Sequence, residues 1–448
     1  MIRHAVVPAY LLLCLLLGGA SAAGFAANLA LQLAALPLIG WAAWQWMQGG
    51  TTTAVRVPLG LMGLFVLLAI AQLVPLPPAL WTRLPGRDMV IEGYRLLGLP
   101  LPWLPLTLAP DAALASILWL LPAFAVLLAM LLLGAFRGRI VAGVIVAVTL
   151  ASVALGALQV IGGESAYLYR VTNYGVAVGF FANGNHNATL MLVCIPFLAA
   201  LQAALLRGGR SPRSASAVRL LVGAGYAVIV VGLGINASLA GIGLAVPVAL
   251  GTWLTFGRMR PMLRRGLSVM TLLLSLAALA TIAVGPFGNN LFGQQTTDPA
   301  LSRQTSFALT WQAARRFFPV GSGTGSFQPV YRTQERLDTV TTVYMNHAHN
   351  DWLEILLETG LPGIVLALLV VAWWLRRARA IWIADEADPF ARAAVIAIGA
   401  MLAHSLVDYP LRTAGLAAVF ATCLGLISGA RPYVRVRRQA SNVRHLAL

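Results

Sequence analysis

Lysine is absent from this sequence, and only 10% of its 448 residues are charged. A soluble domain typically carries about 25% charged residues. Hydrophobic residues make up 59% of the chain and the mean hydropathy is +0.81. A soluble fold of this length has no interior large enough for so much apolar surface, so we expect lipid to be the main solvent. The few cysteines, Cys14, Cys194 and Cys423, are too scattered for a disulfide framework or a metal site.

Charge is also missing from long stretches of the chain, and a spanning helix needs roughly 20 apolar residues. The pattern predicts an all-α integral membrane protein with about 12 transmembrane helices, a turn near Gly234–Ala237 dividing one long stretch into two. Met1–Gly24 has the features of a signal peptide, but the next apolar segment follows immediately, which favours an uncleaved first helix. The charge-free stretches are 4–55, 57–82, 112–136, 140–163, 171–206, 220–257, 266–297, 359–375, 393–407 and 413–430.

The basic residues, all of them arginine, give a net charge of +17. Roughly two thirds of them fall in alternate loops and in the C-terminal tail, which is the distribution of the positive-inside rule. This pattern favours a bacterial inner-membrane protein with cytoplasmic N- and C-termini and argues against nucleic-acid binding. Cytoplasmic arginines would include Arg56, the Arg207–Arg219 cluster and Arg376–Arg379.

The alternation of inner and outer loops between successive spans also predicts how the chain is organised. Residues 1–284 would hold transmembrane helices 1–9, with a Pro-rich outer loop at about 75–111. Residues 285–358 would form a large, partly helical outer loop, which carries most of the polar chemistry. Residues 359–430 would hold helices 10–12, and 431–448 a basic cytoplasmic tail.

Two features of the large loop precede its densest polar cluster. Ser302–Phe318 has the pattern of a helix that ends at Pro319, with Trp311 among its apolar positions. Gly321-Ser-Gly323-Thr-Gly325 follows, and glycine at every second position allows successive N–H groups to hold an anion. A tight turn is the more frequent explanation, and the G-x-G-x-x-G fingerprint is not matched.

His347-Ala-His349-Asn350-Asp351 is the densest titratable cluster outside the predicted spans. An apolar face after Asn350 predicts a short helix that Gly360 ends, so His349 would lie at its head. Imidazole suits general-base work near neutral pH. The alternatives are a helix cap with incidental surface histidines, or a metal site formed by His347, His349 and Asp351.

Arginines on the outer side form a second group, and guanidinium is the preferred partner of phosphate because it stays charged and binds two oxygens at once. Most of these arginines could instead be solvated or paired with acidic residues, so we expect two or three to contact a ligand. The set comprises Arg170, Arg303, Arg315, Arg316, Arg332, Arg336 and Arg412.

Two more polar groups lie at predicted membrane edges. Asn183 and Asn185 stand where an outer loop enters a span, where amides bind sugar hydroxyls or, more often, cap the helix. His404 and Asp408 are four residues apart, as are Asp408 and Arg412, so each pair shares a helix face. A structural ion pair and a functional role both fit, although ionisable groups at membrane depth favour function.

Several of these motifs resemble those of one family. His349-Asn350, nine residues, then Gly360-Leu361-Pro362-Gly363 resembles the signature of the O-antigen ligase and polymerase superfamily. The likeness extends over roughly residues 175 to 425. Three supporting segments are Arg303…Trp311…Ala314…Pro319-Val-Gly321-Ser-Gly323, Gly179-Phe-Phe-Ala-Asn183-Gly-Asn185 and His404-Ser-Leu-Val-Asp408-Tyr-Pro.

The resemblance implies a lipid-dependent, GT-C-like membrane glycosyltransferase of lipopolysaccharide synthesis, active on the periplasmic side. A ligase would move O-antigen polysaccharide from undecaprenyl pyrophosphate to a sugar hydroxyl of lipid A–core, inverting the anomeric carbon without a metal or other cofactor. His349 would be the general base. The implied substrate-binding residues are Arg303, Arg170, Arg316, Arg412, Asn183, Asn185, His347 and Asp408.

Length and number of spans favour a ligase within this class. The alternatives are an O-antigen polymerase, a protein O-oligosaccharyltransferase and, outside enzymes, a polysaccharide transporter or flippase, which would place polar groups at the membrane midplane. One position departs from the family, whose members often have Ser-Arg at the start of a central helix. This chain has Ser238-Leu239, so another arginine, for which Arg170 is our candidate, would bind pyrophosphate instead.

Overall fold

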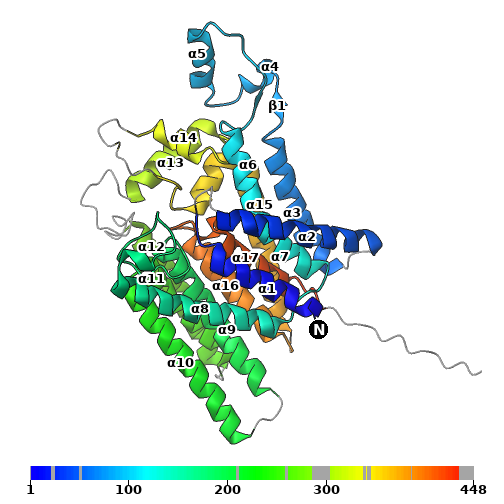
Figure 1. The fold of residues 1–448 in the computed structure, drawn as a ribbon, viewed down its shortest axis with the longest axis vertical. Helices are drawn as coiled ribbons and strands as arrows, with labels where there is room; N and C mark the ends of the chain where they lie inside the picture. Colours follow the sequence, from blue (N-terminus) through cyan, green and yellow to red (C-terminus); the bar gives the residue numbers. More distant parts are fainter. Residues whose placement is uncertain are drawn as a thin grey trace, which may run out of the picture.

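Helices form almost all of the regular structure in this computed structural model, which describes residues 2–21, 26–49, 53–207, 211–257, 261–284, 303–335, 340, 345–384 and 386–432 (Figure 1). Within those residues, eight helical segments are long and apolar enough to cross a membrane. They are α2 (Ala26–Gln48), α3 (Thr53–Ala71), the consecutive α6 and α7 (Pro110–Trp119 and Leu121–Leu131), α8 (Gly138–Gly162), α9 (Gly184–Leu206), α10 (Pro212–Asn236), α11 (Leu239–Phe256) and α15 (Asp351–Ile383).

Four further helices contain shorter apolar segments. They are α1 (Val6–Leu17, preceded by the 3-10 turn Ile2–Ala5), α12 (Pro261–Val284), α16 (Pro389–His404) and α17 (Ala414–Ile427). The chain is therefore a multi-pass, mostly helical membrane protein. The number of about 12 spans stays a prediction from the charge pattern.

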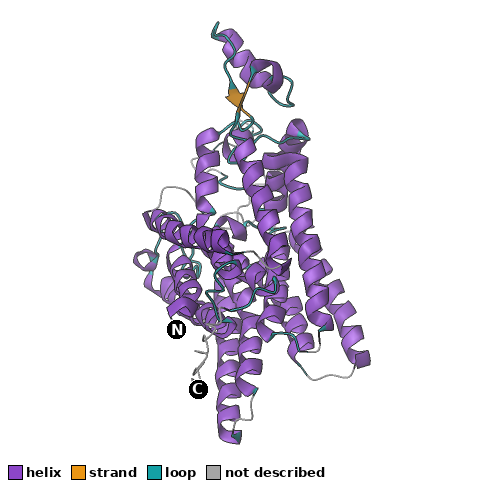
Figure 2. Ribbon diagram, turned by 90° about the vertical axis from the view of Figure 1, so that its right-hand side faces the viewer, coloured by secondary structure: helices purple, strands orange, loops and turns teal. Residues whose placement is uncertain are grey.

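One end of the molecule carries short elements that lie between the long apolar helices in the chain, and we call it the loop end (Figures 1 and 2). Its outermost part is a two-stranded antiparallel ribbon of β1 (Pro75–Leu76) and β2 (Leu104–Pro105). Helices α4 (Pro78–Trp81) and α5 (Asp88–Leu96) lie between these strands in the chain. Two more elements, α13 (Arg303–Phe317) and α14 (Phe327–Arg332), share this end, whereas α9 and α10 meet at the opposite end (Figure 1).

The core centres on α9, which packs against α8, α10, α11 and α16. A second packed layer joins α1, α7 and α17, and alanine supplies several of the buried positions of α7 and α17. Lipid tails are as apolar as leucine, so helices in a membrane associate through close packing of small residues. This explains the alanine-rich contacts and fixes the loop-end termini of α9, α16 and α17 near one another.

Helix boundaries differ from the charge pattern at one span. The stretch 171–206 predicted a helix, but α9 begins at Gly184 and an irregular segment with the short turn Glu164–Ala166 precedes it. A stretch without charged residues indicates a hydrophobic composition but does not require a helical backbone. Here Gly175 and Gly179 adopt positive φ angles, which an α-helix does not contain.

Other local predictions are confirmed. The break between two helices falls at Ala237, whose φ is 55°, and Ser238 caps α11 by accepting the N–H of Gly241. Helix α13 covers the predicted Ser302–Phe318, except that Ser302 lies outside the described residues. Arg336, residues 285–301 of the predicted outer loop and the tail beyond 432 also lie outside the described residues.

Candidate functional site

The candidate site is built on the first turns of α15. Asn350 caps the helix by accepting the N–H of Leu353 at 3.0 Å, as the sequence predicted. The first helical stretch ends at Gly360, where φ is 59° and ψ −148°. A Cβ at Gly360 would lie 2.1 Å from the carbonyl oxygen of Pro319, so only glycine fits this kink. The rest of α15 continues towards the opposite end.

The glycine-rich loop closes the end of that short helix. The N–H groups of Ser322 and Gly323 donate to the carbonyls of Leu357 and Glu358, at 2.9 and 2.8 Å. These are carbonyls that a helix end leaves unpaired, so the loop acts as a cap supplied from outside the helix. The geometry also joins α13 firmly to α15.

This arrangement does not support the anion-binding interpretation of the loop. The amide of Gly321 donates to Phe317, that of Thr324 to the Gln72 side chain, and that of Ser326 to Gly323. The amides that would converge on a phosphate are therefore already bound to protein oxygens. A tight turn explains why glycine stands at 321, 323 and 325, because all three residues adopt positive φ angles.

Three carboxylates of α15 converge on one arginine. Asp351, Glu354 and Glu358 are spaced three and four residues apart, which places them on one helical face. Arg412, on the 3-10 turn η6 (Pro410–Arg412), reaches them with Nε at 3.3 Å from Asp351 and Nη1 at 3.3 and 3.5 Å from Glu354 and Glu358. Burial lowers the pKa of Arg412, but the three carboxylates outweigh it and the net shift is upward.

Glu354 also holds the histidine-bearing segment. Its Oε1 accepts from Nδ1 of His347 at 2.8 Å, and its Oε2 accepts from the backbone N–H of Ala348 at 2.8 Å. Burial lowers the pKa of His347, yet the Glu354 carboxylate raises it above its ordinary value. The stabilisation by this pair is therefore fully present below about pH 6.5 and is lost as pH rises through the raised pKa.

His349 is buried, with 2% of its surface exposed, and the expectation of incidental surface histidines is wrong for it. Its backbone lies in the left-handed region with φ of 52°. Nδ1 lies 3.0 Å from the carbonyl oxygen of His347, and a neutral ring that donates there keeps its lone pair on Nε2. This tautomer leaves Nε2 as the atom able to accept a proton.

Tyr409 occupies the centre of the cluster. Its ring centroid lies 4.6 Å from that of His347, 4.8 Å from His349 and 5.0 Å from His186. Burial, helped by the Asp408 carboxylate, raises the pKa of Tyr409 to about 12, so the phenol stays neutral. The ring thus separates three imidazoles from one another without adding charge.

The amide segment lies on the other side of Tyr409. Asn183 caps α9 by accepting the N–H of Asn185, which confirms the capping interpretation. The Asn185 side chain donates to Asp408 and accepts from the Ser238 hydroxyl at 2.7 Å. Asp408 lies 3.7 Å from Nε2 of His186. Asn185 therefore links the starts of α9 and α11 to the turn after α16, beside the departure from the family at Leu239.

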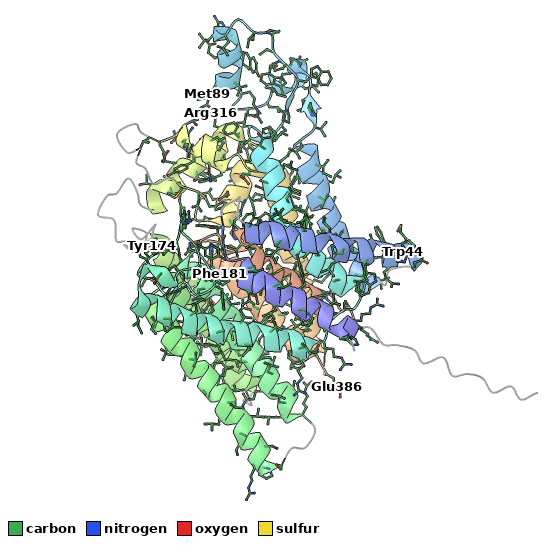
Figure 3. All side chains as sticks on the ribbon, in the orientation of Figure 1. Trp44, Met89, Tyr174, Phe181, Arg316 and Glu386 are labelled. Carbon is green, nitrogen blue, oxygen red and sulfur yellow. The ribbon has the colours of Figure 1, made fainter. Side chains whose placement is uncertain are left out.

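The predicted arginines occupy different surroundings. Arg170 is exposed on the irregular segment before α9, where its carbonyl accepts from the Tyr174 hydroxyl. Arg316 is exposed on α13 at the loop end, and Figure 3 shows it well away from Tyr174. Arg303 begins α13. Arg412, in contrast, has Nε and Nη1 taken by carboxylates, so its geometry favours a structural role over the predicted contact with pyrophosphate.

The metal interpretation required His347, His349 and Asp351 to converge. Instead, His347 contacts Glu354, His349 contacts a backbone carbonyl, and Asp351 accepts from the Ser405 hydroxyl at 2.7 Å as well as from Arg412. Across the part of the chain that the structure describes, no group of three His, Cys, Asp or Glu side chains is placed to hold a metal ion.

An apolar cleft of about 330 Å³ opens beside the cluster. Helices α3, α7, α15 and α17 supply most of its lining. Its few polar lining residues, Asp351, Thr359 and Ser405, come from the first stretch of α15 and from the turn after α16. The cleft therefore runs from the carboxylate cluster along apolar side chains such as Phe65 and Trp373.

Sequence reasoning missed the roles of Glu358 and Tyr409. The spacing of Asp351, Glu354 and Glu358 was a usable signal, because three acids on one face at a membrane edge require a cationic partner. Tyr409 gave no comparable signal, since its three ring contacts come from segments far apart in the sequence.

Fold and site together define a multi-pass membrane protein with a buried cluster of polar residues at the start of α15. A family model described as O-antigen ligase matches residues 221–368, about a third of the chain and a region that includes His349. Over this region the chain is similar to O-antigen ligases. Curated proteins gave no match to the chain.

Proposed function

We propose that the protein is an O-antigen ligase that transfers O-antigen polysaccharide from undecaprenyl pyrophosphate to a sugar hydroxyl of lipid A–core. The observation that carries the proposal is His349, inside the family match, with Nδ1 against a carbonyl and Nε2 left to accept a proton. Metal-independent chemistry of this kind needs one base and cationic groups for the leaving pyrophosphate.

In the proposed reaction, the acceptor hydroxyl gives its proton to Nε2 of His349 while its oxygen attacks the anomeric carbon of the donor glycan. The bond from that carbon to the pyrophosphate oxygen breaks on the opposite face, so the configuration inverts. The leaving pyrophosphate takes the bonding electrons, and arginine neutralises the developing charge. Arg303 is our first candidate for this role, with Arg170 and Arg316 as exposed partners.

The apolar cleft supports a lipid-linked donor. Its lining offers an isoprenoid chain a place between α3, α7, α15 and α17, while the polar end lies at Asp351 near the base. Burial of His349 would restrict hydrolysis of the donor by bulk water, and the acceptor hydroxyl must displace the covering atoms to reach Nε2.

A deletion strain tests the function. We expect loss of long-chain glycan on lipid A–core while lipid-linked polymer accumulates, and recovery when the wild-type gene is returned. Loss of the polymer itself would instead identify an O-antigen polymerase, which runs the same chemistry with a lipid-linked glycan as acceptor. Loss of ligation with the lipid-linked glycan retained on the cytoplasmic side of the membrane would favour a flippase.

A further inference from the structure

His347 has a hydrogen-bond acceptor against each of its ring nitrogens. Nδ1 lies 2.8 Å from Glu354 Oε1, and Nε2 lies 3.2 Å from the carbonyl oxygen of Ser21. A neutral imidazole carries one N–H and satisfies one acceptor, whereas an imidazolium donates to both. The geometry therefore favours the protonated ring.

The charges around His347 agree with this protonation state. Asp351, Glu354 and Glu358 face the single guanidinium of Arg412, so negative charge is in excess in this buried group. An imidazolium at His347 offsets part of that excess, whereas a neutral ring leaves it uncompensated. Arg412 repels the imidazolium, but Glu354 is in direct contact with the ring, and Tyr409 is neutral.

The cation is held next to the proposed base. The carbonyl of His347 accepts from His349 Nδ1, and both rings pack against Tyr409. A positive charge so near disfavours adding a second proton to His349. It would therefore keep His349 neutral, with Nε2 ready to accept a proton, at pH values where an isolated histidine begins to charge.

We propose that His347 is a positioning residue that works as a fixed imidazolium, clamped by Glu354 and the Ser21 carbonyl, and keeps His349 in its neutral, proton-accepting form. This inference rests on the proposed role of His349 as the base. It also explains the contacts of Glu354, whose carboxylate stabilises the protonated ring of His347 and accepts the backbone N–H of Ala348.

The test is the pH dependence of glycan transfer by purified wild-type, His347→Gln and His347→Lys proteins, with His4→Gln as a control outside the site. Glutamine removes the charge, so the acid limb of the rate profile should move up by about half to one pH unit. Lysine restores a charge beside Glu354 and should return the limb close to the wild-type position. If His347 has only a structural role, the acid limb of the rate profile should lie at the same pH in the His347→Gln and His347→Lys proteins.

Identical acid limbs in all variants would overturn the electrostatic role and leave the ligase function standing. Full transfer by a His349→Asn protein would overturn the role of His349 as the base, and absence of transfer by the wild-type protein would overturn the proposed function, so the failures are distinguishable. A second measurement needs no folded variant of His347. Wild-type protein labelled with [¹⁵N]histidine should show an imidazolium nitrogen signal at pH values above the ordinary histidine pKa of about 6.5. Its absence there would contradict the inference.

Discussion

The carboxylate cluster on α15 and the exposed face of α13 both use arginine, but in opposite surroundings. Arg412 is mostly buried and bound to three carboxylates, whereas the Arg316 side chain is exposed and forms no ion pair with the residues that the structure describes. The difference shows that arginines predicted for one group differ in their partners: Arg412 holds the helices around His349 together, whereas Arg316 has an exposed side chain. Spacing along the sequence does not reveal this division.

The largest expected effect is at the base itself. Asparagine tolerates the left-handed backbone of His349, so His349→Asn should fold while losing the proton acceptor. We expect transfer to fall about 10²- to 10⁴-fold. The measurement is initial transfer rate with purified protein at matched melting temperature, and His4→Asn is the control. A rate within a few-fold of wild type would remove the base from this account.

Arg303 tests the proposed contact with the leaving pyrophosphate. Arg303→Ala should lower transfer about 10²- to 10³-fold, the usual effect of removing one group that stabilises leaving charge. Arg303→Lys should recover little, because lysine lacks the planar fork that binds two phosphate oxygens. Rates are compared at saturating donor. A lysine variant as fast as wild type would mean that a point charge suffices.

The structural role of Arg412 is tested by measuring stability. Arg412→Gln leaves Asp351, Glu354 and Glu358 without their cation, and removing one partner of a buried ion pair costs about 3–5 kcal/mol. Arg316→Gln on the exposed face should change stability by less than about 0.5 kcal/mol. Thermal unfolding in detergent reports both. Equal melting temperatures for the two variants would break the division proposed above.

The smallest expected effect concerns metal. Since arginine is proposed to neutralise the leaving pyrophosphate, transfer should persist in excess chelator at close to the untreated rate. Chelated and untreated protein are compared in the same transfer assay. Chelator-sensitive transfer that a divalent cation restores would revive the His347, His349 and Asp351 site.

Local features of the site were predictable from the sequence, and tertiary ones were not. The caps at Asn350 and Asn183 and the kink at Gly360 follow from backbone chemistry that neighbouring residues decide. The partners of Arg412 and the three imidazoles around Tyr409 depend on how α9, α15 and η6 pack. Asp408 and Arg412 share a spacing of four residues, yet Arg412 turns to α15 while Asp408 binds Asn185.

The glycine loop gives a similar lesson. Its pattern allowed an anion nest, but amides of a loop that packs against a helix end are taken by the carbonyls of Leu357 and Glu358. Trp311 likewise counted as an apolar position of α13, yet half of its surface, 51%, is exposed. Composition and periodicity show which face of a helix or loop is apolar, but they do not show which residues pack against that face in the folded protein.

Reconstituted transfer tests the central claim most directly. Purified wild-type protein in liposomes would receive lipid-linked O-antigen, with or without lipid A–core, in the presence of chelator. The account predicts that long-chain glycan appears on lipid A–core only when that acceptor is present, and that the His349→Asn protein does not form it at a comparable rate. Glycan growing on the lipid-linked donor instead, with lipid A–core left unmodified, would contradict it.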